Sequence, residues 1–329
     1  MVRIDEIQVI AVIGAGVMGS GIAQTFAQAG YEVRLQARSE GTLRAARDRI
    51  AGNQEAMVRA GLLSEGLARE AMARIRTTTK LEEAARGCQF VNENVPEDLA
   101  LKREVFAALD RHTPRDAVLS TDTSGLSVGA IASATGRPEM VVGLHWMNPP
   151  HLMPPVEVVR GGRTAEGTMD LTCALARRIG RVPIRVEKDA RGFIWNRLQL
   201  ALVREAIHVV EQGIAGPEAV DLAVTAGLGL RWAAVGPLRL MDLAGLATFH
   251  SVASYLYAEL CAAREPQPAL AARLAAGQTG ARSGRGFYDY PPGQAEAAIA
   301  ARDAKLFELL KIFRPAGVPG KDGAAGASA

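Results

Sequence analysis

A glycine-rich turn between an apolar strand and a helix constrains this chain more than any other feature. The segment VIAVIGAGVMG places Gly14, Gly16 and Gly19 in the G-x-G-x-x-G spacing. In such a turn the first glycine permits the tight bend, the second lets a diphosphate approach the backbone, and the third allows the helix to pack closely on the strand. N–H groups at the helix start bind the phosphates. The segment therefore predicts a dinucleotide site that includes the backbone of Val17 and Met18.

Short apolar strands alternate with helical segments through the first half of the chain. Strands are expected at residues 8–13, 32–36, 89–93, 117–121 and 140–145, and helices at 17–29, 41–59 and 101–111. This alternation predicts a parallel, doubly wound sheet. The polar stretch 43–75 is expected to form a helical pair that projects from the sheet, with a break at Gly61.

The character of the sequence changes after a further expected strand at 182–187. Residues 193–212 are expected to form a long helix at the centre of a second domain, because apolar side chains occupy nearly all of its sides. More helices are expected at 217–228, 237–257 and 268–276. The prediction is an α/β chain with a Rossmann-type dinucleotide-binding domain at 1–187, an all-helical substrate and dimerisation domain at 188–314, and a disordered tail at 315–329.

Composition excludes several classes of partner. The 38 basic and 35 acidic residues give a net charge of +3, which is no electrostatic footprint for nucleic acid. Cys88, Cys173 and Cys261 are scattered without a C-x-x-C pair, so neither a disulfide framework nor a metal site is expected. No stretch is apolar enough to span a bilayer. We expect a cytoplasmic protein that forms a homodimer, because the helical segments 198–210 and 238–257 are more apolar than one small domain needs.

Four polar residues stand where a packed core does not need them. His145 ends an apolar strand and Ser124 follows another, at the edge where open α/β sheets bind ligands. Glu157 lies among apolar neighbours, and Asn196 begins the long helix of the second domain. Three of them have an ordinary alternative when taken alone: a strand-end histidine is usually structural, Glu157 can lie on a wet strand face, and Ser124 can cap a helix.

The chain resembles the 3-hydroxyacyl-CoA dehydrogenase family in a series of motifs over nearly its whole length. In order, these are IGAGVMG from Ile13, PEDLALK from Pro96, GLH ending at His145, GFIWNR from Gly192, Gly236-Pro237 and SGRGFYD from Ser283. The resemblance implies that His145 and Glu157 are the catalytic pair, and that Ser124 and Asn196 are the active-site serine and asparagine. It places Glu97, Lys102 and Asn148 at the nicotinamide side of the cofactor.

The implied reaction interconverts a secondary alcohol and a ketone. The alcohol gives a hydride to nicotinamide and a proton to His145, since a neutral imidazole suits the base role near pH 7. Glu157 would fix the tautomer and stabilise the imidazolium that forms. Ser124 and Asn196 would hold the substrate oxygen, and closure of the two domains would complete the site.

The sequence departs from the family at the end of the second strand. NAD-binding relatives grip the ribose 2′-hydroxyl with an acidic residue there, whereas this chain has Ala37, followed by Arg38 and Ser39. Loss of the carboxylate removes repulsion against a 2′-phosphate, and an adjacent arginine supplies charge-assisted bonds to one. We therefore expect NAD(H) or NADP(H), with NADP(H) favoured; stacking of Arg38 on adenine is the ordinary alternative.

A second departure concerns coenzyme A. Relatives that bind acyl-CoA carry lysines in the projecting helical pair, whereas residues 57–66, MVRAGLLSEG, hold no lysine and one basic residue, Arg59. The arginine-rich stretch 44–59 is expected to be a solvated helix face. The first hypothesis for the substrate is a 3-hydroxyacyl-CoA or a similar compound, and the second is a free hydroxy acid or other alcohol without CoA. A non-catalytic, crystallin-like structural protein is a third reading, against which the complete catalytic set argues.

Overall fold

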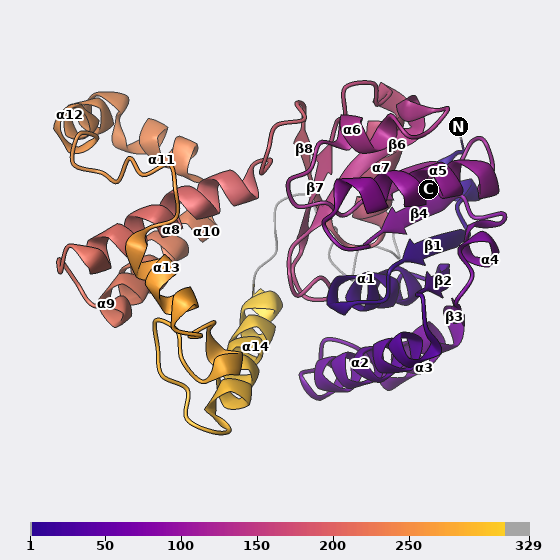
Figure 1. Ribbon diagram of the computed structural model, residues 1–329, viewed down its shortest axis with the longest axis horizontal. Helices are drawn as coiled ribbons and strands as arrows, with labels where there is room; N and C mark the ends of the chain where they lie inside the picture. The colour runs from indigo at the N-terminus through magenta and orange to yellow at the C-terminus, as the bar shows by residue number, and fades with distance from the viewer. Residues whose placement is uncertain (1, 313–329) are drawn as a thin grey trace, which may run out of the picture. The chain divides into compact units, whose positions relative to one another are not determined.

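The computed structural model describes residues 2–312, which divide into two compact units (Figure 1). The first unit is an α/β unit that extends to Ile194 and includes the described residues from Arg302 onward. The second unit, Trp195–Ala301, is helical. The division lies beyond the boundary expected at 187, because the residues after the last strand still bond to the first unit: Asp189 accepts hydrogen bonds from Ser127 Oγ and Gly129 N. The tail expected at 315–329 lies outside the described residues.

In the described residues eight strands form one sheet, in the order β3-β2-β1-β4-β5-β6-β7-β8. Their bounds are β1 Val9–Ile13, β2 Glu32–Gln36, β3 Ile75–Thr78, β4 Phe90–Glu93, β5 Val118–Thr121, β6 Val141–Trp146, β7 Pro155–Val159 and β8 Val182–Val186. The order of β1 to β6 is that of a doubly wound dinucleotide-binding sheet, which confirms the predicted fold class.

The sequence analysis predicted a parallel sheet, but the sheet is mixed. Six of the neighbouring pairs are parallel, and β6–β7 is antiparallel. The connection between β6 and β7, residues 147–154, contains no helix. A parallel crossover needs a longer connection, usually a helix, so this short loop reverses the chain. The sequence analysis did not predict β3, because this strand is short and only its first residue, Ile75, is buried.

Helices cover both faces of the sheet (Figure 1). One face carries α1 Val17–Gln28 and α7 Glu166–Arg178, and the other carries α4 Leu81–Ala85, α5 Leu99–His112 and α6 Val128–Ala132. The expected helical pair is α2 Glu40–Arg59 and α3 Glu65–Arg74, and it packs against α1. Its chain reverses at Gly61, which has a positive φ of 72°. Two short 3₁₀ turns, Ile4–Glu6 and Pro138–Met140, precede β1 and β6.

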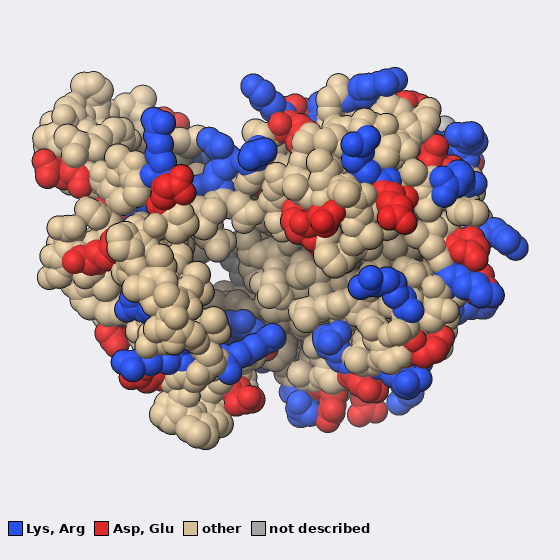
Figure 2. Space-filling view, viewed as in Figure 1, with Lys and Arg blue, Asp and Glu red and all other residues tan. Residues whose placement is uncertain are grey.

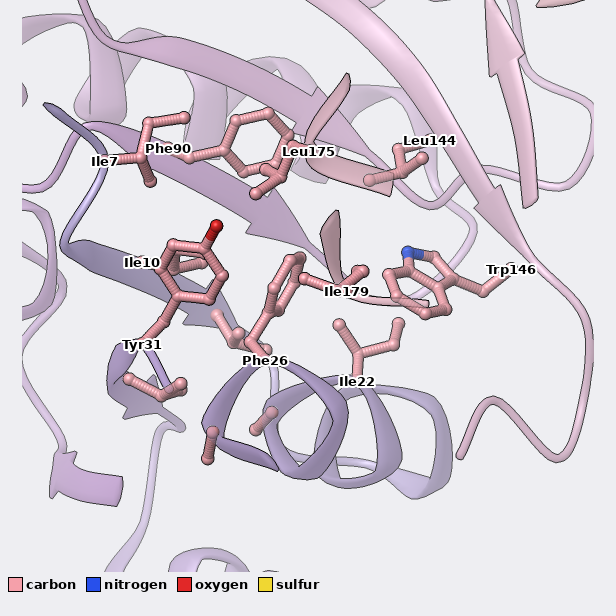
Figure 3. Packing of buried hydrophobic residues seen from close by; sticks show 14 of the residues in the cluster. Ile7, Ile10, Ile22, Phe26, Tyr31, Phe90, Leu144, Trp146, Leu175 and Ile179 are labelled. Atoms are coloured by element: carbon pink, nitrogen blue, oxygen red, sulfur yellow. The ribbon is translucent and has the colours of Figure 1, made fainter. Parts of the chain in front are cut away.

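The larger core cluster locks α1 onto the sheet (Figure 3). The ring of Phe26 on α1 lies 6.4, 6.3 and 5.7 Å from the rings of Tyr31, Phe90 and Trp146, as measured between centroids. Trp146 thus directs its indole to the α1 side of the sheet. Because side chains alternate along a strand, its neighbour His145 points to the opposite face.

The second unit consists of helices and their turns in the described residues. They are α8 Trp195–Glu211, α9 Pro217–Leu222, the π-helical segment Ala223–Gly229, α10 Leu230–Ala234, α11 Pro237–Ala244, α12 Leu246–Leu256, α13 Pro268–Ala275 and the 3₁₀ turn Ala281–Ser283. The last helix, α14 Gln294–Ile312, begins in this unit, and its residues from Arg302 onward belong to the first unit. The helix expected at 237–257 is two helices, because Gly245 breaks it with a φ of 97°. The sequence analysis did not anticipate α14.

Many apolar side chains of the second unit are exposed. On α8 Ile207 is buried, whereas Leu198 and Leu200 are each 61% exposed. Figure 2 shows a broad area without charged side chains over α12. In residues 2–312 no single helix has the length and apolar character to cross a bilayer, although the bent pair Pro217–Ala234 and Pro237–Ala244 has them jointly.

Candidate active site

The antiparallel pairing of β6 and β7 brings His145 and Glu157 together. The register sets these two residues directly opposite each other, so their side chains share one face of the sheet. His145 Nδ1 lies 2.8 Å from Glu157 Oε2. The pair is buried: His145 is 6% exposed and Glu157 is 0% exposed. Because a carboxylate only accepts hydrogen bonds, His145 donates from Nδ1, and the proton-transfer role falls to Nε2.

The segment that ends the first unit supports this pair from a second side. The backbone N–H of Ile194 donates to Glu157 Oε1 at 2.9 Å. The ring of Phe193 lies edge-on to His145, with 5.6 Å between ring centroids. Phe193 has a φ of 47°, in the left-handed region that a bulky residue rarely adopts. This strained turn was missed from the sequence; the glycine that precedes Phe193 was its signal.

Glu97 holds the loop that carries Ser124. Glu97 Oε1 accepts hydrogen bonds from Thr123 Oγ1 at 2.6 Å, from Ser124 N at 3.0 Å and from Gly125 N at 3.2 Å. This loop follows β5, next to the strand that carries His145 in the sheet order. The structure therefore brings Glu97 and Ser124 together at the carboxyl edge of the parallel strands.

Lys102 is buried within the protein. Its side chain is 1% exposed, and Nζ donates to Glu93 Oε1 at 2.8 Å and to the carbonyl oxygen of Val95 at 3.1 Å. Nζ also lies 3.7 Å from Glu97 Oε2. Burial raises the pKa of Glu93, and the Lys102 charge opposes that rise. Lys102 thus places a positive charge beside both Glu93 and Glu97.

The sequence analysis missed two acids at strand ends: Glu93, which is buried, and Asp122, which is half-buried. Glu93 Oε2 accepts a hydrogen bond from Thr121 Oγ1 at 2.7 Å, which joins the ends of β4 and β5. Asp122 Oδ1 accepts one from the backbone N–H of Trp146 at 2.8 Å, which joins β5 to β6. Burial raises the pKa of Asp122 well above its usual value. An acid at the end of an apolar strand was the signal for both residues.

The two predicted asparagines lie in different units. Asn148 is exposed in the β6–β7 loop, three residues after His145. Asn196 is half-buried and is the second residue of α8, in the helical unit. The other predicted polar site residues, His145, Glu157, Ser124, Glu97 and Lys102, all belong to the first unit.

The glycine motif forms a cradle at the start of α1. Gly14 has a φ of 96°, and a Cβ there would lie 2.6 Å from the carbonyl oxygen of Asn94. A Cβ on Gly19 would lie 1.8 Å from the carbonyl oxygen of Gly14. In contrast, a Cβ on Gly16 would meet nothing within 4 Å. The open space is therefore at Gly16, where a diphosphate needs room to approach the backbone. Gly16 directly precedes Val17 and Met18, whose N–H groups begin α1.

The end of β2 is the position that faces the adenosine ribose in this fold. Ala37 is buried there, at 5% exposure, and Arg38 and Ser39 are exposed. Ser39 Oγ accepts a hydrogen bond from Thr42 N at 3.2 Å and so caps α2. Among the described residues no group of three or more His, Cys, Asp and Glu side chains could hold a metal ion.

Known proteins with this sequence pattern match nearly the whole chain. The 5-formyl-3-hydroxy-2-methylpyridine 4-carboxylate 5-dehydrogenase of Mesorhizobium japonicum is 35% identical over 92% of this chain and 97% of its own. A solved structure of an enzyme with that activity has a TM-score of 0.86 at 35% identity and covers 93% of this chain and 98% of its own. A 3-hydroxybutyryl-CoA dehydrogenase of Mycobacterium tuberculosis is 41% identical over 87% of this chain and 99% of its own.

Two family models match consecutive parts of the chain. The model described as 3-hydroxyacyl-CoA dehydrogenase, NAD binding domain, matches residues 9–190. The model described as 3-hydroxyacyl-CoA dehydrogenase, C-terminal domain, matches residues 192–290. The first match shows an NAD-binding domain, and the glycine cradle lies within the matched residues. Together, the buried His145–Glu157 pair, the NAD-binding sheet and the two matched domains show that the chain belongs to the 3-hydroxyacyl-CoA dehydrogenase family.

Proposed function

We propose that this dehydrogenase interconverts the 3-hydroxy and 3-keto forms of a 3-hydroxyacyl-CoA or a similar compound. The observation that carries the proposal is the buried His145–Glu157 pair at the carboxyl edge of an NAD-binding sheet. The acyl-CoA character of the substrate is supported by relatives such as the 3-hydroxybutyryl-CoA dehydrogenases of Bacillus subtilis and M. tuberculosis, at 39% and 41% identity.

The proton transfer follows from the geometry of the pair. Bound NAD(H) supplies the hydride acceptor in oxidation and the donor in reduction. His145 takes the hydroxyl proton at Nε2, and the charge that develops on the ring is stabilised by Glu157 at Nδ1. In reduction the imidazolium returns the proton to the forming alkoxide. The Ser124 loop, fixed by Glu97, provides a hydroxyl for positioning the substrate oxygen.

A substrate without CoA is a second candidate, which the α2–α3 pair favours. Three of its arginines form ion pairs with glutamates one helical turn away: Arg59 with Glu55 at 2.6 Å, Arg69 with Glu65 at 3.6 Å and Arg74 with Glu70 at 2.9 Å. These pairs reduce the positive charge that Arg59, Arg69 and Arg74 would offer to the phosphates of CoA. The relative from M. japonicum, named for a pyridine carboxylate, supports the same candidate.

One comparison of substrates separates these candidates. We expect acetoacetyl-CoA to be reduced with NADH or NADPH much more efficiently than the N-acetylcysteamine thioester of acetoacetate, which has the same acyl group without the nucleotide. Equal efficiencies would favour the CoA-independent candidate, as would turnover of free keto acids or ring-substituted carbonyl compounds alone. A protein that binds the cofactor but reduces no member of the panel would be a structural protein; a lambda-crystallin homolog in humans is 37% identical over 71% of this chain and 74% of its own.

We also propose that NADP(H) is preferred over NAD(H). The support is Ala37 at the position that binds the ribose 2′-hydroxyl in NAD-binding relatives, with the exposed Arg38 beside it. Because position 37 is an alanine, no carboxylate there would repel a 2′-phosphate. Arg38, the next residue after the end of β2, supplies a positive charge that can bind such a phosphate.

We further propose a homodimer formed through the helical unit. The support is the exposure of large apolar side chains on its helices, including Leu230 at 71%, Leu238 at 76% and Leu243 at 71%. Exposed apolar surface on this scale is typical of an interface, and closed pairs are the commonest assembly of identical chains.

A further inference from the structure

The arginines of α2 have different surroundings, although the sequence suggests one solvated face. Arg44 is exposed, whereas Arg49 is half-buried and extends to α1. Arg49 Nη1 lies 3.2 Å from Ser20 Oγ and 3.5 Å from the carbonyl oxygen of Gly16. The expectation of a solvated face is therefore wrong for Arg49, whose guanidinium lies at the glycine cradle.

The electrostatics of this position call for an anion. α1 begins after Gly16, which has no side chain to cap the helix, and the first turn of α1 holds no acidic residue. The N-terminal end of a helix carries a partial positive charge of roughly half an elementary charge. Arg49 adds a full positive charge beside it, and both of its hydrogen-bond partners are uncharged. In residues 2–312 no carboxylate oxygen lies within 4.0 Å of its guanidinium to balance that charge.

The space for the anion is beside the same residues. A Cβ on Gly16 would meet no atom within 4 Å, although the flanking Gly14 and Gly19 are closed in by backbone. The family model that matches this segment describes an NAD binding domain, so a dinucleotide diphosphate is the anion expected over Gly16. A guanidinium forms paired, charge-assisted hydrogen bonds to phosphate oxygens.

We propose that Arg49 binds the diphosphate of the nicotinamide cofactor, as a cationic side chain that acts together with the N–H groups at the start of α1. This inference rests on the proposed function in one respect, that a nicotinamide dinucleotide is the cofactor. It gives α2 a role in binding the cofactor diphosphate at the glycine cradle. It also separates two arginines by their ligand: Arg49 takes the diphosphate common to both cofactors, and Arg38 takes the 2′-phosphate of NADP(H) alone.

The test measures equilibrium binding to the full-length protein without turnover. Arg49→Met and Arg49→Lys are compared with Arg44→Met, a control on the exposed side of α2. The probes are NADH and NADPH by fluorescence, and ADP-ribose, adenosine and free coenzyme A by calorimetry. Loss of a charge-assisted contact should weaken NADH, NADPH and ADP-ribose by the same factor, about ten- to a hundredfold. Arg49→Lys should recover part of that loss, and adenosine and coenzyme A binding should stay unchanged.

Added salt provides a second readout, because a screened ionic contact weakens with ionic strength. NADH binding should depend less on salt in Arg49→Met than in the wild type or in Arg44→Met. Wild-type affinity of Arg49→Met for ADP-ribose would overturn the proposal, as would an equal loss of adenosine affinity, which indicates a structural role. A loss confined to NADPH or to coenzyme A would assign Arg49 to another phosphate and would also overturn it. Failure of the wild type to bind any nicotinamide dinucleotide would instead overturn the proposed function.

Discussion

Glu157 has a defined hydrogen bond on each carboxylate oxygen, one to the His145 ring and one to the backbone of Ile194. An imidazole held in this way has one tautomer and one orientation. The prediction for His145→Gln is a fall in turnover by about 10²–10⁴-fold, since that is the usual contribution of a general base. Affinity for NADH should stay close to that of the wild type. The same assays on His112→Gln, an exposed histidine at the end of α5, provide the control; wild-type turnover of His145→Gln would remove His145 from the mechanism.

Removal of the Glu157 charge should change the pH dependence as well as the rate. We expect Glu157→Gln to reduce kcat by about a hundredfold or more and to move the pH–rate profile for alcohol oxidation to lower pH, because the imidazolium loses its charge partner. Glu104→Gln, at an exposed position on α5, should leave the profile unchanged. A slower enzyme with an unshifted profile would make Glu157 a structural residue.

We also expect cofactor choice to depend on single residues. The wild type should favour NADPH over NADH in kcat/KM by about ten- to a hundredfold, as expected for one charge-assisted bond. Arg38→Ala should remove most of this preference, and Ala37→Asp should reverse it by binding the 2′-hydroxyl and repelling a phosphate. The preference should shrink with added salt. A wild type that favours NADH would show that Arg38 does not contact the ribose phosphate.

At the scale of elements, the buried pair between β4 and α5 ties the cofactor side to the sheet. Lys102→Met leaves Glu93 buried without its partner, so the free energy of unfolding should fall by about 3–5 kcal/mol. Lys80→Met removes the exposed pair with Glu83 and should change it by about 0–1 kcal/mol. Urea unfolding measures both.

The same variants carry a pH signature of known sign. Burial raises the pKa of Glu93 above its usual value, and the opposing Lys102 charge is lost in Lys102→Met. An acid whose pKa is raised in the folded state stabilises that state at low pH and loses this contribution as the pH rises. The destabilisation by Lys102→Met should therefore be larger at pH 8 than at pH 5. An equal loss at both pH values would show that the Lys102 charge does not lower the pKa of Glu93.

Elements with a strong local signal could be predicted from the sequence, and those set by tertiary contacts could not. β2 and the glycine turn have clear periodicity and spacing, so their positions agree with the structure. The antiparallel direction of β7 was not predicted. The direction of a strand depends on the connection before it, here a short loop, and is not written in the residues of the strand itself. Arg49 looks like its solvated neighbours on α2, and only the packing of α2 on α1 reveals its place at Gly16. His145 and Glu157 could be named from resemblance, but their 2.8 Å contact needed the register.

At the scale of the whole molecule, the exposed apolar helices of the second unit predict self-association. Sedimentation at micromolar concentration should show a dimer. Leu238→Glu, at a residue of α11 that is 76% exposed, should shift the protein toward monomer because a charge in an apolar interface must be desolvated. Leu67→Glu, at a residue of α3 in the first unit that is 44% exposed, is the matched control and should leave the dimer intact. A wild type that sediments as a monomer would contradict the proposed assembly.

The opposed register of β6 and β7 has a consequence for how this chain can diverge over generations. Insertion of one residue in β7 before Glu157 would turn that side chain to the other face of the sheet and set a valine against His145, because the period of a strand is two. Side chains in the loop at 147–154 do not alternate between two faces, so insertions or deletions of any length there leave the two strands in phase. Descendants of this sequence should therefore vary in the length of the loop and keep the phase of the two strands, because that phase holds the acid–base pair together.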